Sequence, residues 1–192
     1  MPQHAHATRP SPTPARARLF FALWPDEGVR DAIHKASRGP VSLSDGRPVP
    51  RQNFHVTLAF LGGLDEAATQ QAMAAADEVN LPAFRFELDT LGYWPNSQVL
   101  WFGCGTPPAG PRRLAHALRQ RLTAHTLRPD PGKFALHVTL ARRVHKAAAL
   151  EHAQKIAWDV KQFALICSET RAGGVDYTVR ARWPLGRQHA LI

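Results

Sequence analysis

Cysteine is scarce in this sequence, with only Cys104 and Cys167 among 192 residues. Two cysteines cannot build a disulfide framework, and no Cys-x-x-Cys pair is present that would indicate a zinc site. This usage fits a reducing compartment, so we expect a cytoplasmic protein. The sequence also lacks a carboxylate cluster that could hold a metal ion. We therefore expect neither a metal nor another cofactor.

Long hydrophobic runs are missing as well. No segment approaches the ~20 apolar residues that a membrane-spanning helix needs. Residues 19–24 are too few for the core of a signal peptide, and Pro25, Asp26 and Glu27 follow them directly. We therefore expect no membrane contact. Nothing in the sequence signals an oligomer, so we expect a monomer.

Acidic residues are fewer than basic ones, which gives a formal net charge of +9. A basic surface favours an anionic partner such as nucleic acid, although a generally basic proteome explains the charge equally well. The same two interpretations apply to residues 112–121, where four arginines on a predicted helix are either a stripe for RNA or a solvated face.

The apolar fraction of 44% excludes a fully disordered chain, and the periodicity alternates between strands and helices. Strands are predicted at residues 18–24, 54–61, 84–91, 98–102, 134–141, 163–167 and 175–183. Helices are predicted at residues 25–37, 64–79, 112–126 and 146–158, with a loop at 39–50. We expect one domain over residues 18–186, a disordered tail at 1–17 and a C-terminal tail at 187–192.

An internal repeat stands out within this pattern. The sequence His-Val-Thr-Leu-Ala occurs at residues 55–59 and again at 137–141, each time at the beginning of a predicted strand. Five identical residues are very improbable by chance in so short a chain. Two copies are too few for a solenoid, so the repeat predicts two similar lobes that face each other across a cleft.

The repeat places polar groups on one face of each strand. Alternate side chains share a face, so His55, Thr57 and Ala59 are expected on one side of the first strand. His137, Thr139 and Ala141 are likewise expected on one side of the second. If the lobes face each other, two His-Thr pairs meet in one cleft.

Two imidazoles and two hydroxyls suit the opening of a cyclic phosphodiester. That reaction needs a base that takes a proton from water and an acid that protonates the leaving oxygen, and histidine can be either near neutral pH. The threonine hydroxyls can donate to the phosphate oxygens, where charge must be stabilised. A single histidine at the start of a strand is more often structural, and it is the repetition of the whole unit that favours catalysis.

Arg142 and Arg143 follow the second motif, whereas Phe60 occupies the place of Arg142 in the first. A guanidinium here could bind phosphate through paired hydrogen bonds. Strict alternation puts Arg142 on the face opposite His137, however. It can reach the site only if the strand ends or bulges there.

These motifs resemble the paired His-x-Thr-x motifs of the two-histidine phosphoesterase superfamily. Further segments, at residues 18–23, 53–62, 99–103, 177–178 and 182–185, are similar to the bacterial and archaeal RNA 2',3'-cyclic phosphodiesterases, also called 2'-5' RNA ligases. The resemblance covers about residues 18–186. It implies an α+β fold with two pseudo-symmetric lobes, each with an antiparallel-rich sheet, around a central cleft.

The resemblance also implies an activity: metal-independent hydrolysis of an RNA terminal 2',3'-cyclic phosphate to a 2'-phosphomonoester, with 2'-5' ligation as its reverse. By analogy, His55 protonates the leaving 3' oxygen and His137 activates the attacking water. Thr57, Thr139 and Arg142 are expected to bind the phosphate.

One departure concerns the loop before the second motif. Ala135 and Leu136 precede His137 where many relatives have a proline-containing sequence, which leaves substrate choice open. One alternative is a phosphoesterase of the same superfamily that acts on a small nucleotide, such as a cyclic ADP-ribose phosphate or a 2'-5' oligonucleotide. Another is an RNA-binding module whose histidines are not catalytic.

Overall fold

The computed structural model describes residues 17–146, 154–171 and 174–186. Its strands are β1 (Ala17–Leu23), β2 (Arg47–Pro48), β3 (Val56–Leu64), β4 (Phe84–Leu88), β5 (Thr90–Trp94), β6 (Val99–Gly103), β7 (His137–Arg142), β8 (Ile156–Val160), β9 (Gln162–Arg171) and β10 (Gly174–Pro184). Its helices are α1 (Glu27–Ser42), the short 3₁₀ helix η1 (Arg51–Asn53), α2 (Glu66–Asp77) and α3 (Ala109–Ala124).

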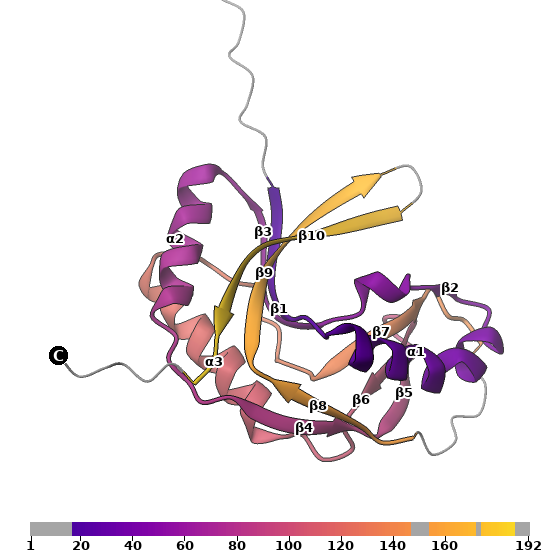
Figure 1. Cartoon of the computed structure of the whole chain (residues 1–192). Helices are drawn as coiled ribbons and strands as arrows, with labels where there is room; N and C mark the ends of the chain where they lie inside the picture. The colour runs from indigo at the N-terminus through magenta and orange to yellow at the C-terminus, as the bar shows by residue number, and fades with distance from the viewer. Residues whose placement is uncertain (1–16, 147–153, 172–173, 187–192) are drawn as a thin grey trace, which may run out of the picture.

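The described strands form two four-stranded sheets and one two-stranded sheet, and every pairing is antiparallel. The first sheet has the order β10-β9-β1-β3 and the second has the order β2-β7-β6-β5, while β4 pairs with β8. Each large sheet holds one copy of the repeat. The α+β architecture with two antiparallel lobes is therefore confirmed (Figure 1).

Helices from each half of the sequence pack on the sheet that holds the motif of the other half. Helix α1 comes from the first half but contacts β6 and β7 of the second sheet, whereas α3 comes from the second half and contacts β3 of the first. Helix α2 packs beside α3 on the first sheet, at the left of Figure 1, while α1 lies with the second sheet at the right. Each motif strand is therefore covered by a helix from the other half of the chain.

Helix α1 begins as predicted, with the carboxylate of Asp26 accepting a hydrogen bond from the amide of Val29 at 2.8 Å. The prediction that residues 39–50 form a loop is wrong at its start, because the helix continues through Pro40 to Ser42. Proline normally breaks a helix interior. Here Val41 packs against the core, and this tertiary contact offsets the local preference.

The strand predicted at residues 84–91 is two strands that belong to different sheets. The chain turns at Asp89, whose amide donates to the carbonyl of Gly103 at 2.9 Å. Its carboxylate accepts from the amide of Gly105 at 2.8 Å and from the hydroxyl of Thr90 at 2.7 Å. These bonds end β4 and begin β5.

The helix predicted at residues 146–158 is wrong in its last part, where β8 lies instead. Ile156, Trp158 and Val160 are buried and Asp159 is exposed, which is the period of two of a half-buried strand. Residues 147–153 of that prediction lie outside the described residues, as do residues 1–16 of the tail predicted at 1–17 and the tail predicted at 187–192. Strand β1 begins at Ala17, one residue before the predicted start of the domain.

Candidate active site

The two copies of the repeat lie next to each other in space. His55 immediately precedes β3 and His137 is the first residue of β7, and these two strands are in contact although they belong to different sheets. The polar ends of both motifs therefore meet in one region, as the repeat predicts.

Both motif strands carry a β-bulge at the same place in the repeat. In the pairing of β1 with β3, Phe21 lies opposite Ala59 and Ala22 opposite Thr57, so Leu58 has no partner residue. In the pairing of β6 with β7, Leu100 lies opposite Ala141 and Trp101 opposite Thr139, so Leu140 has none. The leucine of each copy is thus an extra residue that changes which side chains share a face.

The bulge brings Arg142 to the site. Cross-strand partners share a face of a sheet, and His137, Thr139 and Arg142 lie opposite three alternate residues of β6. Those residues are Gly103, Trp101 and Val99. Arg142 therefore lies on the face of His137 and Thr139, because the bulge shifts the alternation by one residue.

The same registers correct the prediction for the two alanines. Ala59 and Ala141 were expected beside the histidines, but both belong to the buried core on the opposite face. Phe60 takes the place on the site face that strict alternation would give to Ala59. It is the counterpart of Arg142 in the first copy of the repeat.

Both imidazoles are held by the same backbone contact. Nδ1 of His55 donates to the carbonyl of Asn53 at 2.7 Å, and Nδ1 of His137 donates to the carbonyl of Ala135 at 2.9 Å. A carbonyl can only accept, so the proton of each neutral ring lies on Nδ1. Nε2 is then the acceptor, and in His55 it accepts from the hydroxyl of Thr57 at 3.1 Å.

Aromatic rings enclose His55 on several sides. Its ring stacks on Trp24 with a centroid distance of 5.8 Å and meets Tyr177 edge-on at 5.3 Å, while Phe20 lies 4.9 Å away. Among the described residues, His137 has one such neighbour, Trp94, at 4.7 Å. The two imidazoles thus have similar hydrogen bonds and different surroundings.

Burial lowers the pKa of both histidines. It reduces the pKa of His55 to about 4, to which the positive charges of Arg142 and of protonated His137 contribute less, while the bond to Asn53 acts against it. The pKa of His137 is also lowered, first by burial and then by Arg142, against the bond to Ala135. Since Arg142 acts on both rings, its guanidinium is close to both motifs.

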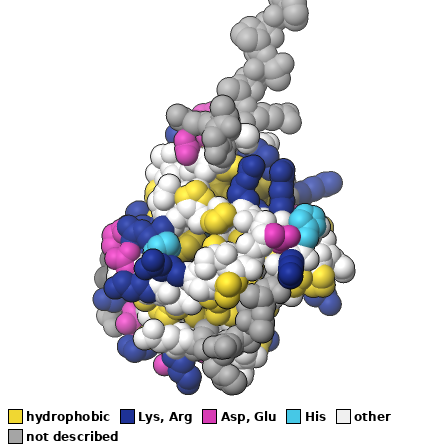
Figure 2. Space-filling view, turned by 90° about the vertical axis from the view of Figure 1, so that its right-hand side faces the viewer, with side chains coloured by type: hydrophobic (Ala, Val, Ile, Leu, Met, Phe, Trp, Pro, Cys, Tyr) yellow, Lys and Arg dark blue, Asp and Glu magenta, His cyan; other side chains and the backbone are white. Residues whose placement is uncertain are grey.

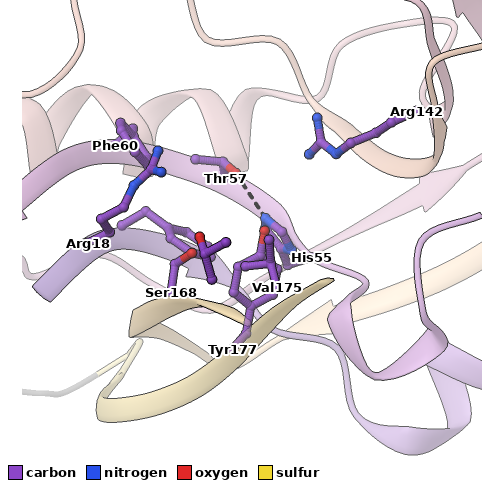
Figure 3. A pocket seen from close by; sticks show the side chains of 10 residues that line it. Arg18, His55, Thr57, Phe60, Arg142, Ser168, Val175 and Tyr177 are labelled. Carbon is purple, nitrogen blue, oxygen red and sulfur yellow. Dashed lines mark hydrogen bonds between the residues drawn. The ribbon is translucent and has the colours of Figure 1, made fainter. Parts of the chain in front are cut away.

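Two cavities open beside His55. The first, of about 280 Å³, is lined by His55, Thr57, Phe60, Arg142 and Tyr177, together with Arg18, Phe20, Ser168, Thr170 and Val175 (Figure 3). The second, of about 410 Å³, adds Thr139 and several residues of the β2 region. Arg142 reaches toward His55 and Thr57 from the opposite side of the first cavity in Figure 3.

Four of the predicted site residues therefore lie around adjoining cavities, namely His55, Thr57, Thr139 and Arg142. His137 is close enough to His55 for its positive charge to lower the pKa of His55. His55 is the only described histidine that lines either cavity, and His137 itself lines neither.

The sequence alone did not indicate the residues that surround His55 and line the cavity beside it. Phe20 and Arg18 alternate on β1 with the core residues Leu19 and Phe21, so a second buried face of this strand was a usable signal. Tyr177 reaches the site from β10, about 120 positions away in the chain, and no local pattern could have placed it there.

Within the residues that the structure describes, no group of three or more His, Cys, Asp or Glu side chains lies together as metal ligands would. No described helix is both long and apolar enough to cross a membrane.

Chemically, the site offers two nitrogen atoms that can exchange protons, two hydroxyl donors and one guanidinium cation. A cation and hydroxyl donors suit an anionic group with several oxygens, and paired Nε2 atoms can remove one proton and deliver another. This arrangement matches displacement at a phosphodiester.

Comparison with known proteins points to the same family as the paired motifs. A family model described as 2'-5' RNA ligase superfamily matches residues 25–171. The RNA 2',3'-cyclic phosphodiesterase of Escherichia coli is 33% identical over 171 residues, covering 88% of this chain and 96% of the relative. That of Thermus thermophilus is 33% identical over 183 residues, covering 90% and 92%.

Solved structures agree with this result. The crystal structure of E. coli LigT complexed with 3'-AMP superposes with a TM-score of 0.83 at 31% identity, covering 90% of this chain and 99% of that one. The structure of TT0787 from T. thermophilus superposes with a TM-score of 0.76 at 30% identity. With its paired motifs, its two-lobed fold and these matches over most of its length, the chain belongs to the 2'-5' RNA ligase superfamily.

Proposed function

We propose that this protein hydrolyses the terminal 2',3'-cyclic phosphate of RNA to a 2'-phosphomonoester, with 2'-5' ligation as the reverse reaction. The observation that carries the proposal is the pair of imidazoles with Nδ1 bound to a backbone carbonyl, one from each copy of the repeat. The relatives named RNA 2',3'-cyclic phosphodiesterase support it.

In the proposed mechanism, Nε2 of His137 takes a proton from water while the water oxygen bonds to phosphorus. The bond between phosphorus and the 3' oxygen breaks, and Nε2 of His55 delivers its proton to that oxygen. The phosphate stays on the 2' oxygen, and the proton count balances because one histidine gains what the other loses. The assignment of acid and base follows the family analogy.

Thr57, Thr139 and Arg142 bind the phosphate oxygens in this proposal. In the free protein, the hydroxyl of Thr57 donates to Nε2 of His55. A bound phosphate would accept that hydroxyl instead and leave Nε2 free for the proton transfer. Arg142, close to both rings, would balance the charge that the phosphate carries through the transition state.

The test is hydrolysis of a nucleoside 2',3'-cyclic phosphate in EDTA, with identification of the product isomer. We expect turnover to the 2'-phosphate, and His55→Ala and His137→Ala should each lower kcat by ~10²- to 10⁴-fold. A cyclic-ended oligonucleotide is tested beside it. No turnover of either substrate by the native protein would contradict the proposal.

Two alternatives make different predictions in the same assay. A phosphoesterase for small nucleotides would turn over a cyclic ADP-ribose phosphate or a 2'-5' oligonucleotide in preference to RNA ends. An RNA-binding module would bind RNA in a salt-sensitive way, unchanged in His55→Ala and His137→Ala, without turnover. The aromatic and cationic lining of the first cavity supports a nucleotide ligand in either enzymatic case.

We also propose that the protein acts in the cytoplasm as a monomer without a metal. The scarcity of cysteine supports the cytoplasmic location, and sedimentation at several protein concentrations tests the monomeric state. Activity that EDTA abolishes and one divalent ion restores would contradict independence of a metal.

A further inference from the structure

The second cavity differs from the first in its charge. Arginine side chains line it from two strands, and none of the residues around it is acidic. Its lining comprises Arg47, Pro48, Val49, Pro50, Asn53, His55, Thr139, Arg142, Arg143, Val175 and Tyr177. It shares His55, Arg142, Val175 and Tyr177 with the first cavity, so the two spaces join at the proposed reaction centre.

Backbone geometry brings the three arginines together. Arg47 of β2 lies directly opposite Arg142 of β7 in the antiparallel ladder. Arg143 has a φ of +57°, in the left-handed region, so consecutive arginines line one cavity where an extended strand would point them apart. This conformation is unfavourable for a residue with a side chain.

The residues that follow hold this conformation in place. The amide of Val144 donates to the carbonyl of Gln98 at 3.0 Å, and the hydroxyl of Tyr93 donates to the carbonyl of Val144 at 2.7 Å. The carboxylate of Asp45 accepts from the amides of His145 and Lys146, both at 2.9 Å. A strained residue fixed this firmly beside a reaction centre points to a role in binding.

The positive charges of this cluster are not neutralised within the part of the chain that the structure describes. There, Arg47, Arg142 and Arg143 make no ion pair, whereas Arg51 nearby pairs with Glu27 at 2.9 Å. In Figure 2, dark blue Lys and Arg side chains gather beside exposed hydrophobic ones in the upper part of the face. Cations that repel one another around a cavity favour a bound anion.

We propose that the second cavity binds the phosphodiester on the 5' side of the terminal nucleoside, and so selects an RNA end over a free nucleoside cyclic phosphate. This inference rests on the proposed function. Arg47 and Arg143 hold the upstream phosphate through charge-assisted hydrogen bonds, while Arg142 holds the cyclic phosphate. Pro48, Val49 and Pro50 supply an apolar wall for the upstream sugar or base.

Three substrates separate the contribution of that phosphate. They are a nucleoside 2',3'-cyclic phosphate, a dinucleotide that ends in the same cyclic phosphate, and this dinucleotide with an uncharged methylphosphonate as its internal linkage. The upstream sugar of both dinucleotides is 2'-deoxy, so that the linkage is stable. We expect kcat/KM for the charged dinucleotide to exceed that for the nucleoside cyclic phosphate and that for the methylphosphonate dinucleotide by about ten-fold each. This is the factor that one charge-assisted hydrogen bond contributes.

Two variants test the residues. Arg143→Asn keeps a side chain that tolerates a positive φ, and Arg47→Gln keeps the backbone pairing of β2. Each should lower the preference for the charged dinucleotide about ten-fold and leave turnover of the nucleoside cyclic phosphate unchanged. Arg113→Gln is the matched control, because Arg113 is exposed on α3 and should keep the full preference.

The outcomes distinguish the two proposals. No native turnover of any of the three substrates would overturn the proposed function itself. Native turnover without a preference for the charged dinucleotide would overturn only the upstream phosphate site. The upstream phosphate site would also be overturned if the preference survived in both arginine variants, or if these variants lost turnover equally on all three substrates. A loss of the preference in Arg113→Gln would overturn it as well.

Discussion

His55 and His137 favour the neutral form in the free protein, because burial disfavours the charged one. In the proposed complex, a phosphate between them would supply the negative charge that opposes this effect and would raise both pKa values. Substrate binding would then prepare one ring to carry the proton that the leaving oxygen needs.

We predict a pH dependence from this shift. The reactive form of the free protein has one protonated and one neutral histidine, so kcat/KM should be greatest below pH 6.5, between the two lowered pKa values. The optimum for kcat, which reports the substrate complex, should lie at higher pH. Coincident optima above pH 7 would contradict this explanation.

The same shift predicts how stability changes with pH. The unfolded chain binds a proton at His55 near pH 6.5, whereas the folded chain does so only near pH 4, so the free energy of unfolding falls as pH drops through this window. The loss attributable to His55 is on the order of 2–3 kcal/mol. Urea unfolding at pH 7 and pH 4.5 measures it, and His55→Gln should show a smaller decrease than the native protein.

A sulfur substitution can assign the acid. In this substrate, sulfur replaces the bridging 3' oxygen of the cyclic phosphate, and a thiolate leaves without protonation. The loss of kcat/KM in the variant that lacks the acid should therefore be smaller on this substrate than on the normal one. We expect kcat/KM of His55→Ala to recover at least ten-fold relative to native, and that of His137→Ala not to recover. Recovery in His137→Ala alone would reverse the two roles.

At the scale of elements, the bulges at Leu58 and Leu140 decide which residues face the cleft. Without them, Arg142 would point into the core face and Ala141 into the site. Strand β5, at the edge of the same sheet, carries residues of the site face next to the second motif. Gly92 lies opposite Trp101, whose ring is 5.1 Å from that of Trp94, and Trp94 in turn contacts His137 at 4.7 Å.

We predict that Gly92→Ala disturbs this row of rings. A methyl group at Gly92 would overlap the ring of Trp101, so we expect a loss of about 1–3 kcal/mol in the free energy of unfolding and a lower kcat. Gly28→Ala in α1 is the control, since the nearest atom outside the adjoining chain, Oδ1 of Asp26, would lie at 3.5 Å from the added methyl group, an ordinary van der Waals distance. It should leave kcat unchanged and should not lower the free energy of unfolding. Equal effects of the two changes would contradict the packing argument.

At the scale of the whole molecule, the exchange of helices joins the lobes. Helix α1 packs on the second sheet and α3 on the first, so neither half of the sequence contains a complete lobe. The main core accordingly includes residues of both, from Ile33 of α1 to Leu118 of α3. The cleft lies between two lobes that share this core.

We predict one cooperative unfolding transition. Leu118→Ala, a change at a fully buried position, should lower the free energy of unfolding by about 2–5 kcal/mol and shift the tryptophan fluorescence and far-UV circular dichroism curves together. Ile33→Val, at the other end of the core, should move both curves in the same way by about 0.5–1.5 kcal/mol. Separate transitions for the two probes would show lobes that unfold independently.

Much of this protein follows from its sequence by itself. The period of the hydrophobic residues gave most strands and helices, and the repeat identified His55, Thr57, His137 and Thr139 before any fold was known. These features are readable because they depend on neighbours a few positions apart. The predicted catalytic and phosphate-binding roles stay predictions until the variants are measured.

Only the tertiary structure decided the rest. The face of Arg142 depends on the register between β6 and β7, the rings around His55 come from β1 and β10, and β8 is a strand because it pairs with β4. Pro40 lies within a helix because Val41 packs against the core. In each case, contacts between segments far apart in the chain outweigh the local preference, and such contacts leave no periodic signal in the sequence.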